Sequence, residues 1–68
     1  MSMPEVGDKV EYNLGAGWRP AEVSRVTHDK PTAQWFVRLD PELDEDHGAV
    51  TVGGKRDRVE KAVRPRRP

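Results

Sequence analysis

The sequence of 68 residues contains no cysteine and only two histidines, His28 and His47. The absence of cysteine excludes disulfide bonds and thiolate metal ligands, and two histidines are too few for an ordinary zinc site. Neither histidine has a nearby serine, cysteine or pair of carboxylates in an arrangement that nucleophilic catalysis requires, so we expect both to be loop residues. We therefore expect a protein that is not an enzyme and that holds no metal or cofactor.

Long hydrophobic runs are also missing from this chain. No apolar stretch approaches the roughly 20 residues that a membrane-spanning helix needs. The first residues, Met1 to Glu5, lack the basic and then apolar order of a secretory signal peptide. We expect a soluble, cytoplasmic protein that has no membrane partner.

Helical periodicity is weak throughout, because glycine and proline interrupt every long stretch. Short segments of alternating apolar and polar residues predict strands instead. In the second strand, which begins near Trp18 or Arg19, a bulge at Ser24-Arg25 is needed to return Val26 to the apolar face. The predicted elements are a first strand around Val10–Tyr12, a second strand through Val26, a third over Gln34–Leu39, an acidic loop over Asp40–Gly48, a fourth strand over Ala49–Val52, a turn with one 3₁₀ turn over Gly53–Arg58, and a fifth strand over Val59–Val63.

Five short strands in about sixty residues favour a small all-β barrel, because closing the sheet removes exposed strand edges. We expect one domain over residues 1–63, followed by a frayed basic tail over residues 64–68. Trp35 alternates with Val37 and Leu39, so its ring is assigned to the interior. The predicted core consists of Val6, Val10, Ala21, Val23, Val26, Trp35, Val37, Leu39, Val50, Val52, Val59 and Val63.

Four short motifs carry a resemblance to a known fold group. Gly7-Asp8-Lys9-Val10, the run from Gly17 to Val23, Phe36-Val37-Arg38-Leu39-Asp40 and Arg58-Val59 occur in this order. Together they resemble the SH3-like barrels, a group that includes Tudor and KOW domains. The resemblance implies a five-stranded SH3-like barrel with a short 3₁₀ turn before the last strand, and a role as a binding module.

The opening of the chain carries a second resemblance. The run from Gly7 to Val23 is similar, without gaps, to the opening of the type II, plasmid-borne dihydrofolate reductases. Those enzymes are SH3-like tetramers that bind NADPH and dihydrofolate in a central pore lined by a Val-Gln-Ile-Tyr strand. Here Thr51 and Gly53 replace the glutamine and tyrosine of that strand, and Tyr12 replaces a lysine of the first strand. A divergent reductase-like oligomer is therefore the alternative to a binding module.

Aromatic residues number only four, which limits a methyl-lysine cage of the Tudor kind. With Trp35 in the core, the other three remain for a contact surface. We expect a protein partner, or a second copy of the chain, to bind this surface. Its predicted residues are Tyr12, Trp18, Phe36 and Arg38, and Phe36 beside Arg38 also suits a nucleic-acid base.

Charge is divided unevenly along a chain whose formal net charge is zero. Residues 1–54 carry five basic and ten acidic side chains, whereas residues 55–68 carry seven basic and two acidic ones. The basic end predicts either salt-sensitive binding to nucleic acid or a tail that folds back onto the protein's own acidic residues. The residues predicted for nucleic acid are Lys55, Arg56, Arg58, Lys61, Arg64, Arg66 and Arg67.

An acidic run places Asp40, Glu42, Asp44 and Asp46 at every second position. A calcium loop uses such spacing, but the glycine and glutamate that an EF-hand requires are replaced here by Glu45 and Thr51. We expect a solvated acidic loop without metal.

Overall fold

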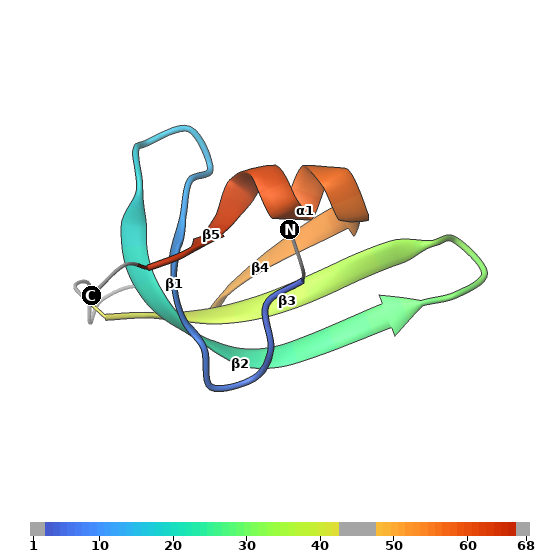
Figure 1. Ribbon diagram of the computed structural model, residues 1–68, viewed down its shortest axis with the longest axis horizontal. Coiled ribbons are helices and arrows are strands. Elements are labelled where there is room, and N and C mark those ends of the chain that lie inside the picture. The colour runs from blue at the N-terminus through green and yellow to red at the C-terminus, as the bar shows by residue number, and fades with distance from the viewer. Residues whose placement is uncertain (1–2, 43–47, 67–68) are drawn as a thin grey trace.

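A computed structural model describes residues 3–42 and 48–66, which form a five-stranded antiparallel sheet and one short helix (Figure 1). The strands lie in the order β4-β3-β2-β1-β5, so the first and last strands of the chain are neighbours. β2 and β3 form a long hairpin that projects beyond the rest of the molecule. The elements are β1 (Lys9–Tyr12), β2 (Arg19–Asp29), β3 (Gln34–Pro41), β4 (Val50–Lys55), α1 (Arg56–Ala62) and β5 (Val63–Pro65).

The predicted bulge in the second strand is confirmed. The β2–β3 register shifts between Val23 and Arg25, after which Val26 lies opposite Val37. Val26 thereby packs against the core although the alternation of two breaks in the sequence. β2 extends further than expected, to Asp29, so that His28 belongs to a strand and stacks on Trp35 with ring centroids 4.0 Å apart.

The core occupies the inner face of the curled sheet, beneath α1. Its buried residues are Val10, Tyr12, Ala21, Val23, Val37, Leu39, Val52, Val59 and Val63. Val26, Trp35 and Val50 of the predicted core are partly buried and pack against this cluster. The prediction was wrong for Val6, which lies in a turn with Gly7 and is 64% exposed.

The prediction of a turn followed by a fifth strand over Val59–Val63 was wrong. Residues Arg56–Ala62 form α1, and only Val63 of the predicted strand enters β5. Arg56 and Glu60 form an i,i+4 ion pair, Asp57 lies in the first turn and Lys61 in the last, which are placements that stabilise a helix.

The supposed tail belongs in part to the sheet. Arg64 and Pro65 pair with β1, and the Arg66 amide donates to the Lys9 carbonyl at 3.2 Å. Arg67 and Pro68 lie outside the described residues. β4 and β5 stand at opposite ends of the strand order, so the sheet is not closed into a barrel within the described residues. Instead, α1 packs against β3, β4 and β5.

The acidic run begins inside β3 rather than in a loop. Asp40 and Pro41 end β3, and Glu42 follows the strand directly, whereas positions 43–47 lie outside the described residues. Within residues 3–42 and 48–66, no three histidine, aspartate or glutamate side chains cluster as metal ligands do. α1, the helix that these residues form, is too short to cross a membrane.

Candidate functional site

The predicted aromatic surface is divided by the fold. Tyr12 shares the inner face of β1 with Val10 and is buried in the core. Trp18 and Phe36 are each 37% exposed but line separate hollows of the surface. Arg38 lines the same hollow as Phe36, so these two predicted residues lie together on the surface. The buried Tyr12 contributes no exposed surface.

Several predicted nucleic-acid residues are engaged within the chain. Arg64 donates its Nε to Glu11 at 3.1 Å and lies 3.9 Å from the centroid of the Trp18 ring. Arg56 is paired with Glu60. Lys55, Arg58 and Lys61 are exposed, and Arg67 lies outside the described residues. The fold-back of the basic end onto acidic residues, one of the two predicted alternatives, is therefore realised by part of that end.

Glu42, which follows β3, contacts Lys9 of β1 and Arg66, which follows β5. Both carboxylate oxygens accept from Arg66 at 2.8 Å, and Lys9 Nζ lies 3.3 Å from Oε1. The Arg66 guanidinium, with Lys9, holds the pKa of Glu42 at about 2, well below its ordinary value. Lys9 also contacts Glu22 at 2.7 Å, and its pKa is raised chiefly by that carboxylate.

The outer face of β2, β3 and β4 holds a different cluster of residues. Arg25 and Arg38 lie directly opposite each other in the β2–β3 register, and Thr51 lies opposite Arg38 on β4. The next row consists of Thr27, Phe36 and Gly53. A shallow hollow of about 560 Å³ lies on this face and is lined by Arg25, Thr27, Phe36, Arg38, Ala49 and Thr51. We call this surface the arginine–phenylalanine face.

The ring of Phe36 packs against the neighbouring strand, β4. A Cβ atom added at Gly53 would lie 2.9 Å from Phe36 Cδ1. The ring therefore covers the backbone of β4 at the one position of this row without a side chain. By strand alternation, Lys55 lies on the same face, one row beyond Phe36, about 7 Å along the strand.

Two like charges lie directly opposite each other on the arginine–phenylalanine face. Like charges directly opposite each other on neighbouring strands repel. Within residues 3–42 and 48–66, neither Arg25 nor Arg38 forms an ion pair, and both are exposed. The adjoining row carries two acidic residues, Glu22 and Asp40, of which Glu22 forms an ion pair with Lys9. An anion bound between the two guanidinium groups would relieve this repulsion.

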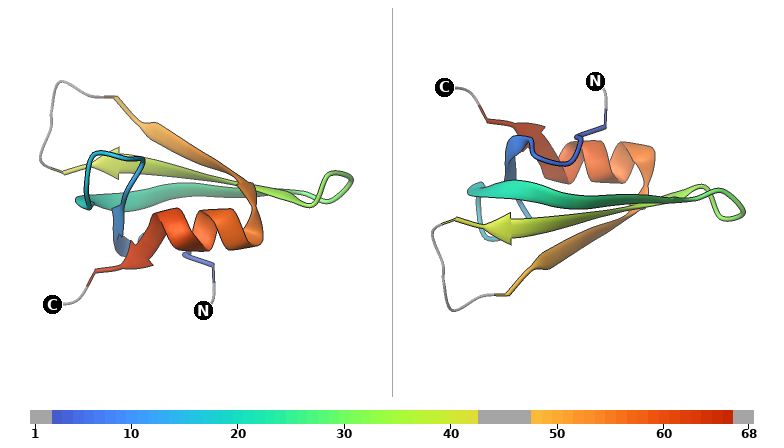
Figure 2. Two further views of the ribbon diagram at one scale, coloured as in Figure 1. Left: turned by 90° about the horizontal axis from the view of Figure 1, so that it is seen from above. Right: turned by 90° about the horizontal axis from the view of Figure 1, so that it is seen from below.

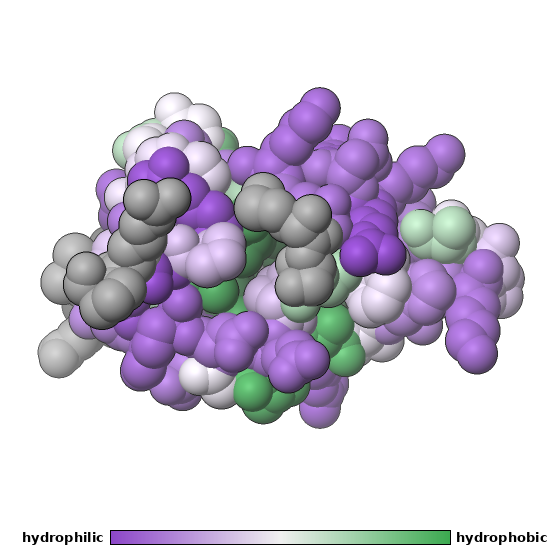
Figure 3. Space-filling model, in the orientation of Figure 1, coloured by the Kyte–Doolittle hydropathy of each residue, from purple (hydrophilic) through white to green (hydrophobic). Residues whose placement is uncertain are grey.

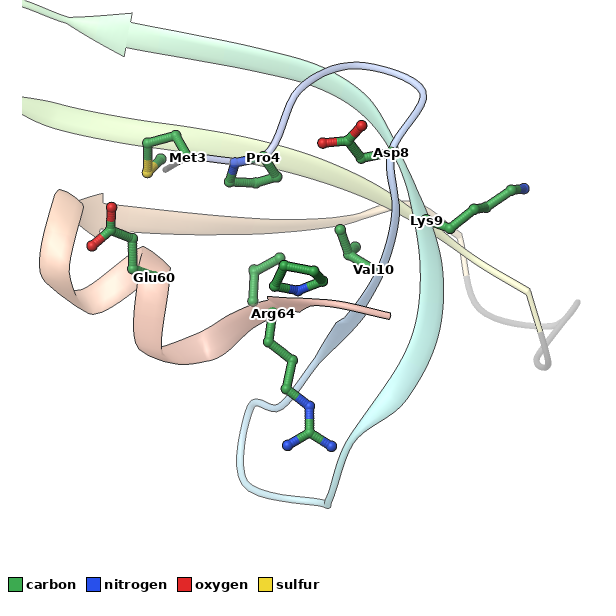
Figure 4. Close-up of a pocket in the computed structure, with 9 residues that line it drawn as sticks. Met3, Pro4, Asp8, Lys9, Val10, Glu60 and Arg64 are labelled. Atoms are coloured by element: carbon green, nitrogen blue, oxygen red, sulfur yellow. The ribbon is translucent and has the colours of Figure 1, made fainter. Parts of the chain in front are cut away.

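Two further hollows of the surface are lined by different residues. One of about 280 Å³ has Val10 and Val63 as its apolar floor, with Met3 and Pro4 at one side. In Figure 4 the charged ends of Lys9 and Arg64 point away from this hollow. The other lies between Trp18 and α1, where Arg64 covers the indole ring. The surface in Figure 3 is mostly hydrophilic, with small hydrophobic patches.

Sequence reasoning paired Phe36 with Arg38 but missed Arg25. The available signal was the bulge, because the extra residue decides which face Arg25 takes. Lys55 was grouped with the basic end because of its position in the sequence, whereas the long β4 brings it to the face that carries Phe36.

Comparison with known proteins gives no further assignment: no family model, curated protein or solved structure matches the chain.

Proposed function

We propose that this protein is a non-enzymatic binding module that takes a single strand of nucleic acid on its arginine–phenylalanine face. The observation that carries the proposal is the direct juxtaposition of Arg25 and Arg38 beside an exposed aromatic ring. Guanidinium groups bind phosphate through charge-assisted, bidentate hydrogen bonds, and aromatic rings stack on bases.

The arrangement favours a single strand over a duplex. Phe36 has one side of its ring against Gly53 and is 37% exposed, so an unpaired base can stack on it. In a duplex the bases are already stacked on one another and do not present a free ring face. Successive rows of the sheet lie about 7 Å apart. Along this face the arginine pair is therefore followed by the Phe36 ring and then by Lys55, an order in which positive groups alternate with an aromatic ring.

The charges of the chain also support this face rather than the basic end as the main contact. Arg64 and Arg66 are held by Glu11 and Glu42, so their binding to phosphate requires that internal ion pairs break. Arg25 and Arg38 gain a counter-charge without that loss. The affinity for nucleic acid should therefore depend more strongly on Arg25 and Arg38 than on the basic end.

The proposal is tested by fluorescence anisotropy with a labelled oligothymidine and with a duplex of the same length. We expect the single strand to bind more tightly, with an affinity that falls as salt concentration rises. Arg38→Gln should reduce the logarithmic salt slope by about 0.7, the value expected for one lost phosphate contact on a single strand.

Lys61→Gln is the matched control, because it removes the same charge from the exposed surface of α1. This variant should bind as the native chain does. If Lys61→Gln weakens binding as much as Arg38→Gln, the contact belongs to the basic end. Failure of any single strand to bind at low salt would overturn the proposal.

The finer classification of the fold is part of this proposal. We infer an SH3-like arrangement from the strand order, in which β5 pairs with β1 and the bulged β2 joins two halves of one curled sheet. A short helix takes the place of the 3₁₀ turn. The protein-binding role of Trp18 and the reductase-like alternative stay predictions, and titration with NADPH tests the second of them.

A further inference from the structure

The charge of the outer face changes sign along β3. Arg38 lies opposite Arg25, and Asp40, the next outer residue of β3, lies opposite Glu22. Glu22 is already held in an ion pair, whereas Asp40 forms none within the part of the chain that the structure describes. On its other side, the arginine pair is followed by the exposed aromatic ring of this face. The arginine pair therefore stands between an aromatic ring and a row of carboxylates.

This order of charges limits how far a bound strand can continue. From Lys55, the path along the face passes over Phe36 and reaches Arg38. A phosphate placed one row further would lie beside the carboxylate of Asp40, and like charges repel. A strand of nucleic acid should therefore end at the arginine pair rather than run past it.

The arginine pair also carries more positive charge than a phosphate inside a strand can neutralise. Each internal phosphate has one negative charge, whereas two guanidinium groups face each other here. A phosphomonoester at the end of a strand carries about −1.5 to −2 at pH 7 and offers three terminal oxygens. Side chains directly opposite each other have Cβ atoms about 4.5–5.5 Å apart, so both arginines can reach one phosphate group. The hydroxyl of Thr51, opposite Arg38 on β4, is a third donor in this row.

We propose that the arginine–phenylalanine face binds the phosphorylated end of a single strand, with the terminal phosphate between Arg25 and Arg38 and the terminal base on Phe36. This inference rests on the proposed function and names the class of strand that the face takes. Both rows line the hollow of about 560 Å³, whereas Lys55 does not, so the hollow suits one nucleotide and Lys55 is left for the next phosphate. Figure 2 shows α1 on one side of the β2–β3 hairpin, so the helix leaves this exposed face uncovered.

The test compares oligothymidines of one length that differ only at an end, by isothermal titration calorimetry. One has hydroxyl groups at both ends, one has a 5′-phosphate and one has a 3′-phosphate. A phosphate at one of the two ends should tighten binding by about tenfold, the value of a further charge-assisted hydrogen bond. The methyl ester of that phosphate is the matched ligand control, because it keeps the phosphorus but carries a single negative charge. It should lose most of the gain.

Three variants separate the phosphate contact from the stacking contact. Arg25→Gln should bring the affinities for phosphorylated and unphosphorylated strands close together, because only one guanidinium group of the pair remains. Phe36→Leu should weaken the binding of both strands by a similar factor and keep their ratio, because the base contact is common to them. Lys61→Gln, on the exposed surface of α1, should change neither affinity.

The outcomes distinguish this inference from the proposed function. If single strands bind but a phosphate at neither end tightens binding, the inference is overturned and the proposed function stands. Retention of the full ratio by Arg25→Gln would show that the arginine pair does not hold the terminal phosphate. A thymidine monophosphate that binds as tightly as the phosphorylated strand would identify a free nucleotide as the ligand and contradict the binding of a strand end. If no strand binds, phosphorylated or not, both proposals fail.

Discussion

The ring of Phe36 lies against the backbone of Gly53, its direct partner in the β3–β4 register. A Cβ atom at position 53 would stand 2.9 Å from Cδ1 and 3.0 Å from Cε1 of the ring. Any larger residue at this position must therefore push the ring away from β4. The glycine thus sets where Phe36 presents its exposed side.

We accordingly predict that Gly53→Ala weakens single-strand binding while leaving the fold intact. Because the ring is partly exposed it can swing aside, so unfolding free energy should change by no more than about 1 kcal/mol. Affinity should fall by up to the value of one stacked base, about 1–3 kcal/mol, which is roughly 5- to 150-fold. Anisotropy titrations and urea unfolding measure the two effects.

Gly48→Ala is the control for the loss of glycine itself, because a Cβ atom there meets nothing within 4 Å. Its affinity should equal that of the native chain. A Gly53→Ala protein that binds normally would show that the position of the ring over β4 is unimportant for binding.

The opposed arginines predict effects of opposite sign on stability and binding. In the free protein, Arg25→Gln removes the repulsion from Arg38 and should stabilise the fold by about 0.2–1 kcal/mol. The same variant should bind single strands less tightly, because one phosphate partner is lost. Urea denaturation without ligand and anisotropy titration with ligand separate these effects. A variant that is less stable than the native chain would show that Arg25 is held by favourable contacts.

Much of the fold followed from alternation in the sequence. The alternation of Trp35, Val37 and Leu39 identified the inner face of β3. The alternation of apolar residues in β2 is interrupted after Val23, which required the bulge that the register shows. These features are local, because each depends on residues a few positions apart. Tyr12 was assigned to the contact surface although it alternates in phase with Val10, and the structure places its ring in the core.

The last third of the chain was predicted less well. Val59 and Val63 lie four positions apart, a spacing compatible with one helix face or with two positions on one strand face. The i,i+4 pair of Arg56 and Glu60 favours the helix, but the two glycines before it suggested a turn. The candidate face was predicted only in part, because the meeting of Arg25 with Arg38 depends on the register between two strands.

The contact of Glu42 with Arg66 and Lys9 predicts a specific loss of stability in acid. The pKa of Glu42 is about 2 in the folded chain and lies near 4.5 without these partners. A carboxyl group whose folded pKa is depressed contributes stability above its unfolded pKa, and that contribution disappears as pH falls toward its folded pKa. The native chain should therefore lose stability between about pH 4.5 and pH 2.

Glu42→Gln tests this assignment, because the neutral amide cannot titrate. It should be less stable than the native chain at pH 7, and the difference should shrink as the pH falls through the same window. Glu5→Gln is the control, since no ion pair with the Glu5 carboxylate exists among the described residues. A constant difference between native and Glu42→Gln proteins at all pH values would contradict the assignment. Thermal unfolding followed by circular dichroism provides the measurement.

Two leucines separate the contribution of the core from that of the surface. Leu39 is fully buried between the sheet neighbours Val23 and Val50, whereas Leu14 is 59% exposed in the turn after β1. Leu39→Ala should cost about 2–5 kcal/mol, including the cavity that it leaves. A scaffold of this size has a net stability of roughly 3–5 kcal/mol, so most molecules of this variant should be unfolded at room temperature.

Leu14→Ala removes the same atoms from a site that water already reaches, so the unfolding free energy should change by less than about 0.5 kcal/mol. Near-ultraviolet circular dichroism of the tryptophans, followed through a urea titration, distinguishes the outcomes. Leu39→Ala should lack a cooperative transition, and Leu14→Ala should retain the native midpoint. If both variants unfold with the native midpoint, the inner face of the sheet is not the source of stability, and the assignment of interior and exterior along β3 is wrong. Since that same alternation places Phe36 and Arg38 outside, this experiment also checks the premise of the binding face.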